Sequence, residues 1–321
     1  MVFKVLVSDK LADKAIEIFK SDPDFEVTVK TGLSEDELVR EIPAYDALVV
    51  RSGTKVTRRV IEAAENLKVI GRAGVGVDNI DCEAAKEKGI PVMNVPLGNI
   101  NSAAEHTIAL MLALARNIPQ AHMSMLKGGW DRKRFVGVEV KGKTLGIIGV
   151  GNVGAIVAKI ANGLSMRVIG FSRSKSGEEL AKLGVKKASI EEICRESDFI
   201  VMCLKLTPET RNTLDKEQFE LMKPSARIIN AARGGLINEK ALAEALKSGK
   251  VAGAAIDVWE KEPPAGSPLV GLENVVMTPH LGASTKEAQI NVGVDIAKQI
   301  VKALREGEIV NCVNDVTAIR T

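Results

Sequence analysis

The chain has few of the residues that build disulfide scaffolds and metal centres. Only four cysteines and three histidines occur among its 321 residues, and none of them form a C-x-x-C pair or a cluster with metal-site spacing. The scattered cysteines are typical of a reduced protein of the cell interior. We therefore expect a cytoplasmic protein without a metal site; its cysteines are Cys82, Cys194, Cys203 and Cys312.

Long apolar runs and an excess of one charge are also missing. The longest apolar stretch, residues 108–115, is far shorter than the roughly 20 residues that cross a bilayer. The first residues lack the basic segment and apolar run of a signal peptide. Forty-four basic and 41 acidic residues give a net charge of +3, too balanced to favour a nucleic-acid partner. The sequence predicts a soluble globular protein with neither a membrane nor a nucleic-acid partner.

Short β-branched runs alternate with helical patterns, which is typical of parallel α/β folds. A first series of strands is predicted at 2–7, 25–29, 47–50, 69–73 and 91–95, with helices between them. One long amphipathic helical segment is expected at 102–126. A second series follows at 144–149, 167–171, 199–204, 227–230, 253–258 and 275–277. Its six strands are what a dinucleotide-binding sheet requires.

A last helix, at 285–305, follows the second series and has no strand of its own. We infer that it returns to the first domain. The sequence thus predicts two Rossmann-like or flavodoxin-like doubly wound parallel-sheet domains with the active site in the cleft between them. Residues 1–97 and 281–321 would form a discontinuous substrate-binding domain, and residues 98–280 the dinucleotide-binding domain.

A glycine-rich turn lies between a predicted strand and a predicted helix of the second series. Its pattern is G-x-G-x-x-G over residues 149–154. Such glycines let backbone N–H groups approach a pyrophosphate at the start of a helix. The order of strand, turn and helix favours a nicotinamide nucleotide site over an ordinary turn. The expected contacts are Gly149, Gly151, Asn152, Val153 and Gly154.

The next strand ends in Ser172, Arg173 and Ser174, without the acidic residue that usually binds the adenosine ribose. An arginine between two serines could bind a 2′-phosphate instead. A solvated basic loop is the alternative. The cofactor is therefore NAD or NADP, and this loop favours NADP.

Five segments, in order, resemble the D-isomer-specific 2-hydroxyacid dehydrogenases, and within that family its phosphoglycerate dehydrogenases. They read GRAGVGVDNID at 71–81, SAAEHT at 102–107, NAARGG at 230–235, DVWEKEPP at 257–264 and PHLGAST at 279–285. The resemblance covers nearly the whole chain. It implies hydride transfer between a nicotinamide cofactor and a small anionic D-2-hydroxy acid or 2-keto acid, here D-3-phosphoglycerate and 3-phosphooxypyruvate, a step of serine biosynthesis.

The resemblance implies a catalytic set of Arg233, Glu262 and His280. An imidazole titrates near neutral pH and suits the base that takes the hydroxyl proton. A carboxylate beside it orients the ring and favours its charged form, and an arginine can bind the substrate carboxylate through two parallel hydrogen bonds. The other two histidines, His106 and His122, are expected to be structural or exposed.

The resemblance also implies further binding residues. Asp257 matches a residue near the nicotinamide, although a buried structural cap is an equal alternative. The cofactor set adds Leu204, Lys205, Ala231, Arg233, Asp257, His280 and Ala283. The substrate set comprises Arg51, Ser52, Arg72, Gly74, Val75, Asn99 and Arg134. In this family the long helix builds a dimer through the nucleotide-binding domain, so Arg134 or Arg132 could reach the partner's active site; a solvated basic face is the alternative.

The chain departs from the family pattern at three points. Ser172 replaces the acidic ribose contact, Lys205 stands where a proline is usual, and the chain ends about where the catalytic body ends. We therefore expect no serine-sensing domain and no feedback inhibition through one. A glyoxylate/hydroxypyruvate-type or sulfolactate-type dehydrogenase would use the same catalytic residues. A more distant alternative is a non-catalytic NAD(H)-sensing scaffold or corepressor on the same fold.

Overall fold

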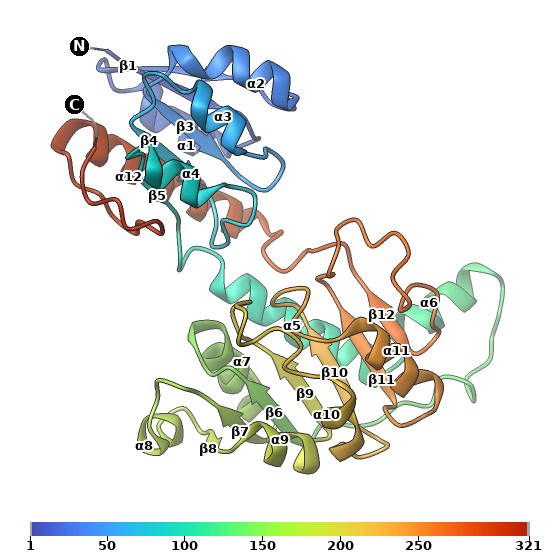
Figure 1. Ribbon diagram of the computed structural model, residues 1–321. Coiled ribbons are helices and arrows are strands. Elements are labelled where there is room, and N and C mark those ends of the chain that lie inside the picture. The colour runs from blue at the N-terminus through green and yellow to red at the C-terminus, as the bar shows by residue number, and fades with distance from the viewer. Residues whose placement is uncertain (1, 320–321) are drawn as a thin grey trace. The chain divides into compact units, whose positions relative to one another are not determined.

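The computed structural model describes residues 2–319, which fold into two compact units (Figure 1). Of these described residues, 2–99 and 284–319 form one unit and 100–283 the other. In both sheets every strand pair is parallel. Within residues 2–319, no helix is both long and apolar enough to cross a membrane.

The first unit is built on a five-stranded sheet in the order β2-β1-β3-β4-β5. Its strands are β1 (Phe3–Val7), β2 (Phe25–Val29), β3 (Ala47–Val50), β4 (Val69–Arg72) and β5 (Val92–Met93). One face packs against α1 (Asp13–Lys20) and α12 (Lys286–Glu306). The other face packs against α2 (Glu35–Glu41), the 3-10 turn η1 (Ile42–Ala44), α3 (Arg58–Ala63) and α4 (Cys82–Glu87). This strand order is that of a flavodoxin-like sheet.

The C-terminal helix α12 belongs to this first unit, as its position after the second series predicts. Its buried face includes Val292, Ile296 and Ile300, which pack against α1 and β4. Gly71 of β4 lies directly beneath it, because a Cβ there would come within 2.5 Å of the Ile300 side chain. A residue without a side chain therefore brings helix and strand together.

The second unit has a seven-stranded sheet in the order β12-β11-β10-β9-β6-β7-β8. Its strands are β6 (Thr144–Ile148), β7 (Arg167–Phe171), β8 (Lys186–Lys187), β9 (Phe199–Met202), β10 (Arg227–Asn230), β11 (Gly253–Ile256) and β12 (Val275–Met277). On one face lie α5 (Ile100–Ala115), α7 (Asn152–Gly163) and α8 (Gly177–Ala181). On the other lie α9 (Ile190–Glu196), α10 (Lys216–Leu221) and α11 (Glu239–Lys247). The order is that of a Rossmann sheet with one added strand.

The structure differs from the sequence prediction at two places in this unit. The expected single helix over 102–126 is wrong: α5 ends at Ala115, Asn117 adopts φ 53°, and α6 (Ile118–Leu126) begins with Pro119 in its first turn. Proline lacks the N–H that would continue a helix. The sheet also contains β8, whose two exposed lysines carry no apolar pattern.

Candidate active site

The glycine-rich turn between β6 and α7 has the geometry that a pyrophosphate needs. Gly149 adopts φ +106°, and a Cβ there would come within 2.8 Å of the Cys203 backbone. A Cβ on Gly154 would lie 2.6 Å from the Gly149 oxygen, so the helix starts tightly against the turn. A Cβ on Gly151 would meet no atom within 4 Å, so the space beside this residue is open. Gly151 is the N-cap of α7 and, having no side chain, makes no capping hydrogen bond to the first N–H groups of the helix. The first N–H groups of α7, together with this open space, fit the pyrophosphate of a bound dinucleotide.

The turn after β7 carries basic rather than acidic side chains. Ser172 is buried, and its hydroxyl accepts a hydrogen bond from the Lys175 N–H at 3.2 Å. Arg173 and Ser174 are exposed. After the neighbouring strand β9, Leu204 is half-buried and Lys205 is exposed. Residues 172–174 after β7 and 203–205 after β9 thus include no carboxylate for a ribose.

His280 and Glu262 form a close pair. The His280 Nδ1 lies 2.8 Å from Oε2 and 3.0 Å from Oε1 of Glu262. Both side chains remain accessible, at 48% and 41% exposure. An accessible imidazole oriented by a carboxylate can exchange a proton with a ligand and remain stabilised when charged. The structure thus joins two of the three residues of the predicted catalytic set.

Arg233 lies in the turn that follows β10, and Asn230 shapes this turn. The Asn230 side-chain amide donates to the Arg233 carbonyl at 2.9 Å and accepts from the Ala232 N–H at 3.1 Å. The Arg233 guanidinium donates to the Ala232 carbonyl at 2.7 Å. Gly234 packs so closely that a Cβ there would lie 1.8 Å from the Trp259 carbonyl oxygen. The Arg233 turn therefore rests directly on the segment that leads to Glu262.

Trp259, which sequence reasoning did not single out, connects this segment to the His280 segment. It is 6% exposed; its backbone N–H donates to Glu262 Oε1 at 3.2 Å and its indole N–H to the Thr278 carbonyl at 3.3 Å. Glu239 holds the same segment from α11, accepting from the Glu260 N–H at 2.7 Å and the Ser267 hydroxyl at 2.5 Å. The D-V-W motif, which the sequence displays, was the available signal for Trp259.

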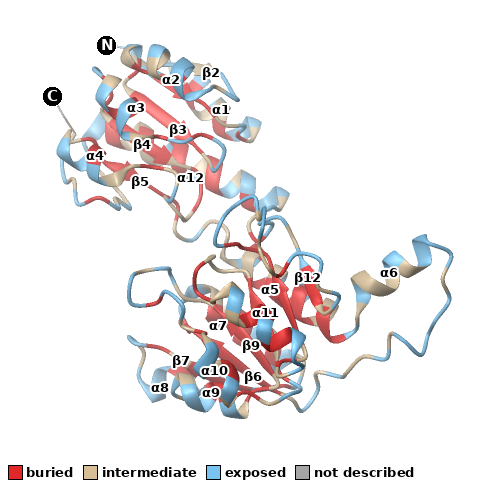
Figure 2. Cartoon of the chain, turned by 45° about the vertical axis from the view of Figure 1, so that its right-hand side comes forward, coloured by how far each residue is buried: buried red, intermediate tan, exposed pale blue. Residues whose placement is uncertain are grey.

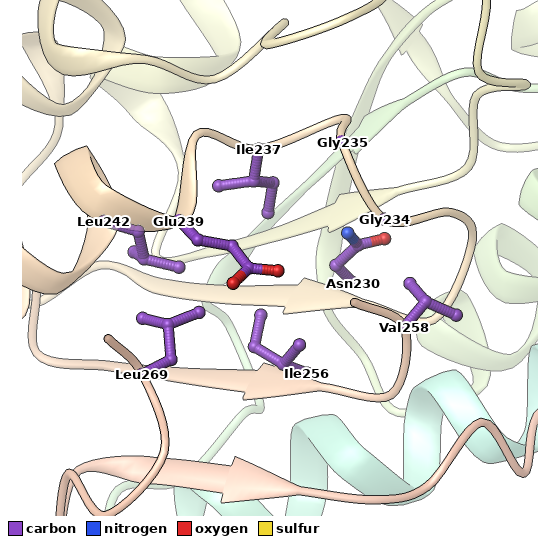
Figure 3. Close-up of a pocket in the computed structure, with 9 residues that line it drawn as sticks. All are labelled: Asn230, Gly234, Gly235, Ile237, Glu239, Leu242, Ile256, Val258 and Leu269. Atoms are coloured by element: carbon purple, nitrogen blue, oxygen red, sulfur yellow. The ribbon is translucent and has the colours of Figure 1, made fainter. Parts of the chain in front are cut away.

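Figure 3 shows a small cavity under the Arg233 turn. Its volume is about 10 Å³, which is room for at most one water molecule. It is therefore a packing gap rather than a substrate pocket. Its lining comprises Asn230, Gly234, Gly235, Ile237, Glu239, Leu242, Ile256, Val258 and Leu269.

Asp257 is fully buried at the end of β11 and binds the segment around His280. Its carboxylate accepts hydrogen bonds from the Thr278 hydroxyl (2.6 Å) and the N–H groups of Leu281 (2.7 Å) and Gly282 (2.9 Å). Its backbone carbonyl accepts from the His280 N–H at 2.8 Å. Burial alone would raise the pKa of Asp257, but hydrogen bonds from His106, Thr278, Leu281 and Gly282 outweigh it and hold the pKa below its ordinary value. The carboxylate is thus an ionised structural anchor for this turn.

In the first unit, the predicted substrate residues follow β3 and β4, which pair side by side with Val50 opposite Arg72. Two polar side chains missed by sequence reasoning hold the loop after β3. Asp9 accepts from the Arg51 N–H at 2.6 Å and the Thr54 N–H at 3.1 Å. Asn79 donates to the carbonyls of Arg51 and Thr54 at 2.8 and 2.7 Å. Asn79 belongs to the D-N-I-D motif, and nothing in the sequence pattern marked Asp9.

Arg72 and Gly74 adjoin each other at the end of β4. Gly74 adopts φ +152°, and a Cβ there would overlap the Arg72 guanidinium, at 1.6 Å from Nη1. Val75 and Asn99 are half-buried.

The remaining predicted binding residues lie in the second unit. Arg134 is exposed and donates to Glu273 at 3.2 Å, while Ala231 and Ala283 are half-buried. Among residues 2–319, no three His, Cys, Asp or Glu side chains are grouped as a metal site would require.

Comparison with known proteins gives consistent matches. Residues 108–282 match the model of the D-isomer specific 2-hydroxyacid dehydrogenase, NAD binding domain. Two curated relatives named D-3-phosphoglycerate dehydrogenase are 54% identical (Methanocaldococcus jannaschii) and 52% identical (Archaeoglobus fulgidus) over 312 residues, 97% of this chain. A solved glyoxylate reductase from Paecilomyes thermophila superposes with a TM-score of 0.85 at 31% identity, covering 97% of this chain and 98% of that one.

The chain spans 59% of the length of those two curated relatives. The matched domain covers more than half of the 321 residues. The glycine-rich turn and the His280–Glu262 pair both lie within it. The chain therefore belongs to the D-isomer-specific 2-hydroxyacid dehydrogenase family.

Proposed function

We propose that this chain interconverts D-3-phosphoglycerate and 3-phosphooxypyruvate. The observation that carries the chemistry is the His280–Glu262 pair, 2.8 Å apart, in the unit that holds the glycine-rich turn. The choice of substrate is supported by the two relatives of that name at 52% and 54% identity. When bound at the turn, the nicotinamide supplies or accepts the hydride of substrate C2.

The proton and the carboxylate are handled by three side chains. Glu262 engages Nδ1 of His280, so Nε2 is the nitrogen that takes the hydroxyl proton in oxidation and returns it in reduction. The Glu262 carboxylate stabilises the imidazolium that forms. Arg233 binds the substrate carboxylate and thereby orients C2 for hydride transfer.

The first unit would bind the remaining part of the substrate. Its candidates are Arg51, Ser52, Arg72, Gly74, Val75 and Asn99, and in the proposed dimer Arg134 would reach the site of the partner copy. The loop of Arg51 and the end of β4 are neighbours at the carboxyl edge of the sheet, where ligands of such sheets bind. Two arginines at this edge suit a substrate that carries a phosphate besides its carboxylate.

Steady-state turnover of the purified chain tests the substrate. We expect kcat/KM for 3-phosphooxypyruvate to exceed that for hydroxypyruvate, glyoxylate and sulfopyruvate by at least tenfold. An equal or greater value for hydroxypyruvate or glyoxylate would assign the chain to the reductase type of the solved neighbour.

A non-catalytic role on this fold predicts a different result. His280→Ala removes the base and should lower kcat by about 10²–10⁴-fold while the protein still binds its nucleotide. If His280→Ala leaves the rate unchanged, or if no 2-keto acid is turned over at all, the chain is a nucleotide-sensing scaffold instead.

We propose that the turn after β7 accepts the 2′-phosphate of NADP(H), so that the chain uses NADP(H) as well as NAD(H). Support comes from the exposed Arg173 and Lys205 and from the absence of a carboxylate at Ser172. The Glu209 carboxylate opposes this role, because a negative charge near Arg173 competes with a phosphate for the guanidinium. The pKa of Glu209 is lowered chiefly by a hydrogen bond from Thr207, and the nearby charge of Arg173 lowers it further.

Substitution of Arg173 tests the cofactor preference. Arg173→Ala should raise the KM for NADPH at least fivefold and leave the KM for NADH within twofold. Arg195→Ala, in the last turn of α9, is the matched control. Equal effects of Arg173→Ala on both cofactors would remove the 2′-phosphate role.

We also propose that the chain is a cytoplasmic homodimer that associates through the second unit. Its four cysteines are free, which suits a reducing compartment. Helix α6 buries none of its residues, and Figure 2 shows it and the segment after it extending away from the sheet of its unit. Exposed apolar side chains gather there: Ile118, Met123, Met125, Leu126, Trp130 and Val136.

Sedimentation velocity tests this assembly. The wild-type chain should sediment as a dimer, and Leu126→Glu with Trp130→Glu should sediment as a monomer. A wild-type monomer across the micromolar range would contradict the proposal.

A further inference from the structure

His106 reaches the active-site turn from a different part of the second unit. It lies on α5, which packs against β10, β11 and β12. Its Nε2 is 3.2 Å from Asp257 Oδ1 and 3.4 Å from the Thr278 hydroxyl oxygen, and its side chain is 19% exposed. The Asp257 carboxylate also accepts hydrogen bonds from Thr278, Leu281 and Gly282, which all lie in segment 278–282. Among these described donors, His106 alone lies outside that segment.

The turn that carries His280 requires such an anchor. His280 adopts φ 56°, a left-handed conformation that a non-glycine residue keeps only when its surroundings hold it. Its ring is half exposed and pairs with Glu262. The restraint on its backbone comes from Asp257, which binds residues 278, 280, 281 and 282.

The Asp257 site leaves little freedom for rearrangement. A Cβ on Gly282 would lie 3.3 Å from Oδ2, so the backbone approaches the carboxylate closely at this residue. Three donors share Oδ1, and two of them, His106 and Thr278, are side chains. Substitution can therefore remove either side-chain donor while the backbone N–H donors of Leu281 and Gly282 are retained in the chain.

We propose that His106 is a positioning residue of the active site, which fixes the conformation of the His280 turn through the Asp257 carboxylate. This inference rests on the proposed role of His280 as the acid–base group. His106 itself touches neither the substrate nor the reacting atoms in this scheme. Its donor nitrogen aligns Asp257, and Asp257 aligns the turn.

Four variants separate the donor from simple packing. His106→Leu removes the nitrogen at similar volume, and His106→Gln retains an N–H donor at about the same reach. Thr278→Val removes the other side-chain donor to Oδ1. Thr107→Val is the matched control, because Thr107 is buried on the same helix and its hydroxyl donates only to the Ala103 carbonyl in the described contacts.

Histidine ring NMR gives a readout that does not depend on turnover. The 321-residue chain, labelled at histidine Cε1, has three ring signals, one for each histidine. Each signal is assigned from its loss in the matching variant. We expect the His280 signal to shift in His106→Leu and in Thr278→Val, and to return near the wild-type position in His106→Gln. Thr107→Val should leave it in place.

Kinetics should follow the same pattern. We expect kcat to fall about tenfold in His106→Leu with the KM for the 2-keto acid within twofold, and His106→Gln to recover most of this loss. Because both donors act through one oxygen, His106→Leu and Thr278→Val should combine non-additively.

The proposal is overturned if the His280 signal and kcat are unchanged in His106→Leu, or if His106→Gln is as impaired as His106→Leu. Should His106→Leu not fold, the His280 signals of the other two variants decide. A wild-type signal in His106→Gln with a shifted signal in Thr278→Val supports the proposal, and an unchanged signal in Thr278→Val overturns it. Lack of turnover by the wild-type chain would refute the proposed function, while the NMR comparison would still test the coupling.

Discussion

At the scale of single residues, the candidate active site depends on side chains that hold others. His280 is paired with Glu262 through its ring and with Asp257 through its backbone N–H. Glu262 in turn accepts from the Trp259 N–H. The His280 imidazole is therefore fixed at both its ring and its backbone, which is the preorganisation that the proposed proton transfer requires.

Glu262→Gln should lower kcat by about 10²-fold, because the neutral amide no longer stabilises the imidazolium. Stopped-flow hydride transfer with the preferred 2-keto acid measures this effect. Glu260→Gln is the matched control, since Glu260 lies two residues away and pairs with Arg211. An equal loss in both variants would mean that the Glu262 charge acts only on the general electrostatics of the loop.

Gly74→Ala should raise the KM for 3-phosphooxypyruvate at least fivefold, because the added Cβ displaces the Arg72 guanidinium and strains a backbone at φ +152°. The KM for hydroxypyruvate, which has no phosphate, should change less. Gly32→Ala also places a side chain at positive φ, but in open space, and should leave both constants unchanged. A uniform change in both KM values for Gly74→Ala would contradict a phosphate role for Arg72.

At the scale of elements, many helices begin with side-chain caps that the sequence alone displays. Helices α2, α8 and α9 each start with a capping box, in which a serine and a glutamate three residues later bind each other's backbone N–H. On α9, Ser189 accepts from the Glu192 N–H at 3.1 Å, and Glu192 accepts from the Ser189 N–H at 2.6 Å. These helices could be placed by local chemistry once the serine was recognised as an N-cap.

The α9 cap predicts a pH-dependent contribution to stability. The backbone and hydroxyl of Ser189 lower the pKa of Glu192 below its ordinary value of 4.5. A folded-state pKa below the unfolded one stabilises the protein above the unfolded pKa, and this contribution is lost as pH falls through the folded value. Urea midpoints should therefore be lower for Glu192→Gln than for wild type at pH 7, and the difference should shrink as the pH falls below 4.5.

The adjacent Glu191→Gln is the control for this measurement, because it removes the same charge from the first turn of α9. A pH-independent difference between Glu192→Gln and wild type would show that the cap acts only through its neutral hydrogen bonds.

At the scale of the whole molecule, the chain crosses from the first unit to the second at residue 99 and returns at residue 284. The returning segment contributes α12, whose apolar face completes the core over β1, β3 and β4. Within residues 2–99, α1 alone would cover that sheet face. We therefore expect the stability of the first unit to depend on both ends of the chain.

Ile296→Ala should destabilise the first unit by about 2–5 kcal/mol, because a fully buried side chain is lost from its core. Hydrogen exchange should show faster exchange in β1, β3 and β4, with β6, β9 and β10 unchanged. Lys298→Ala, an exposed position on the same helix, should have no such effect. Equal deprotection of both sheets would mean that the two units unfold together.

The sequence by itself determined the two series of parallel strands, the glycine-rich turn and the family, because period, turn chemistry and motifs are local. The predicted single helix over 102–126 was wrong, because the left-handed Asn117 and the proline at 119 divide this segment into two helices. Only the tertiary structure revealed how Asp9, Asn79, Trp259 and His106 support the predicted site. His106 and Thr278, for example, are 172 residues apart in the sequence. Such contacts depend on how helices and strands distant in the chain pack, which no local pattern encodes.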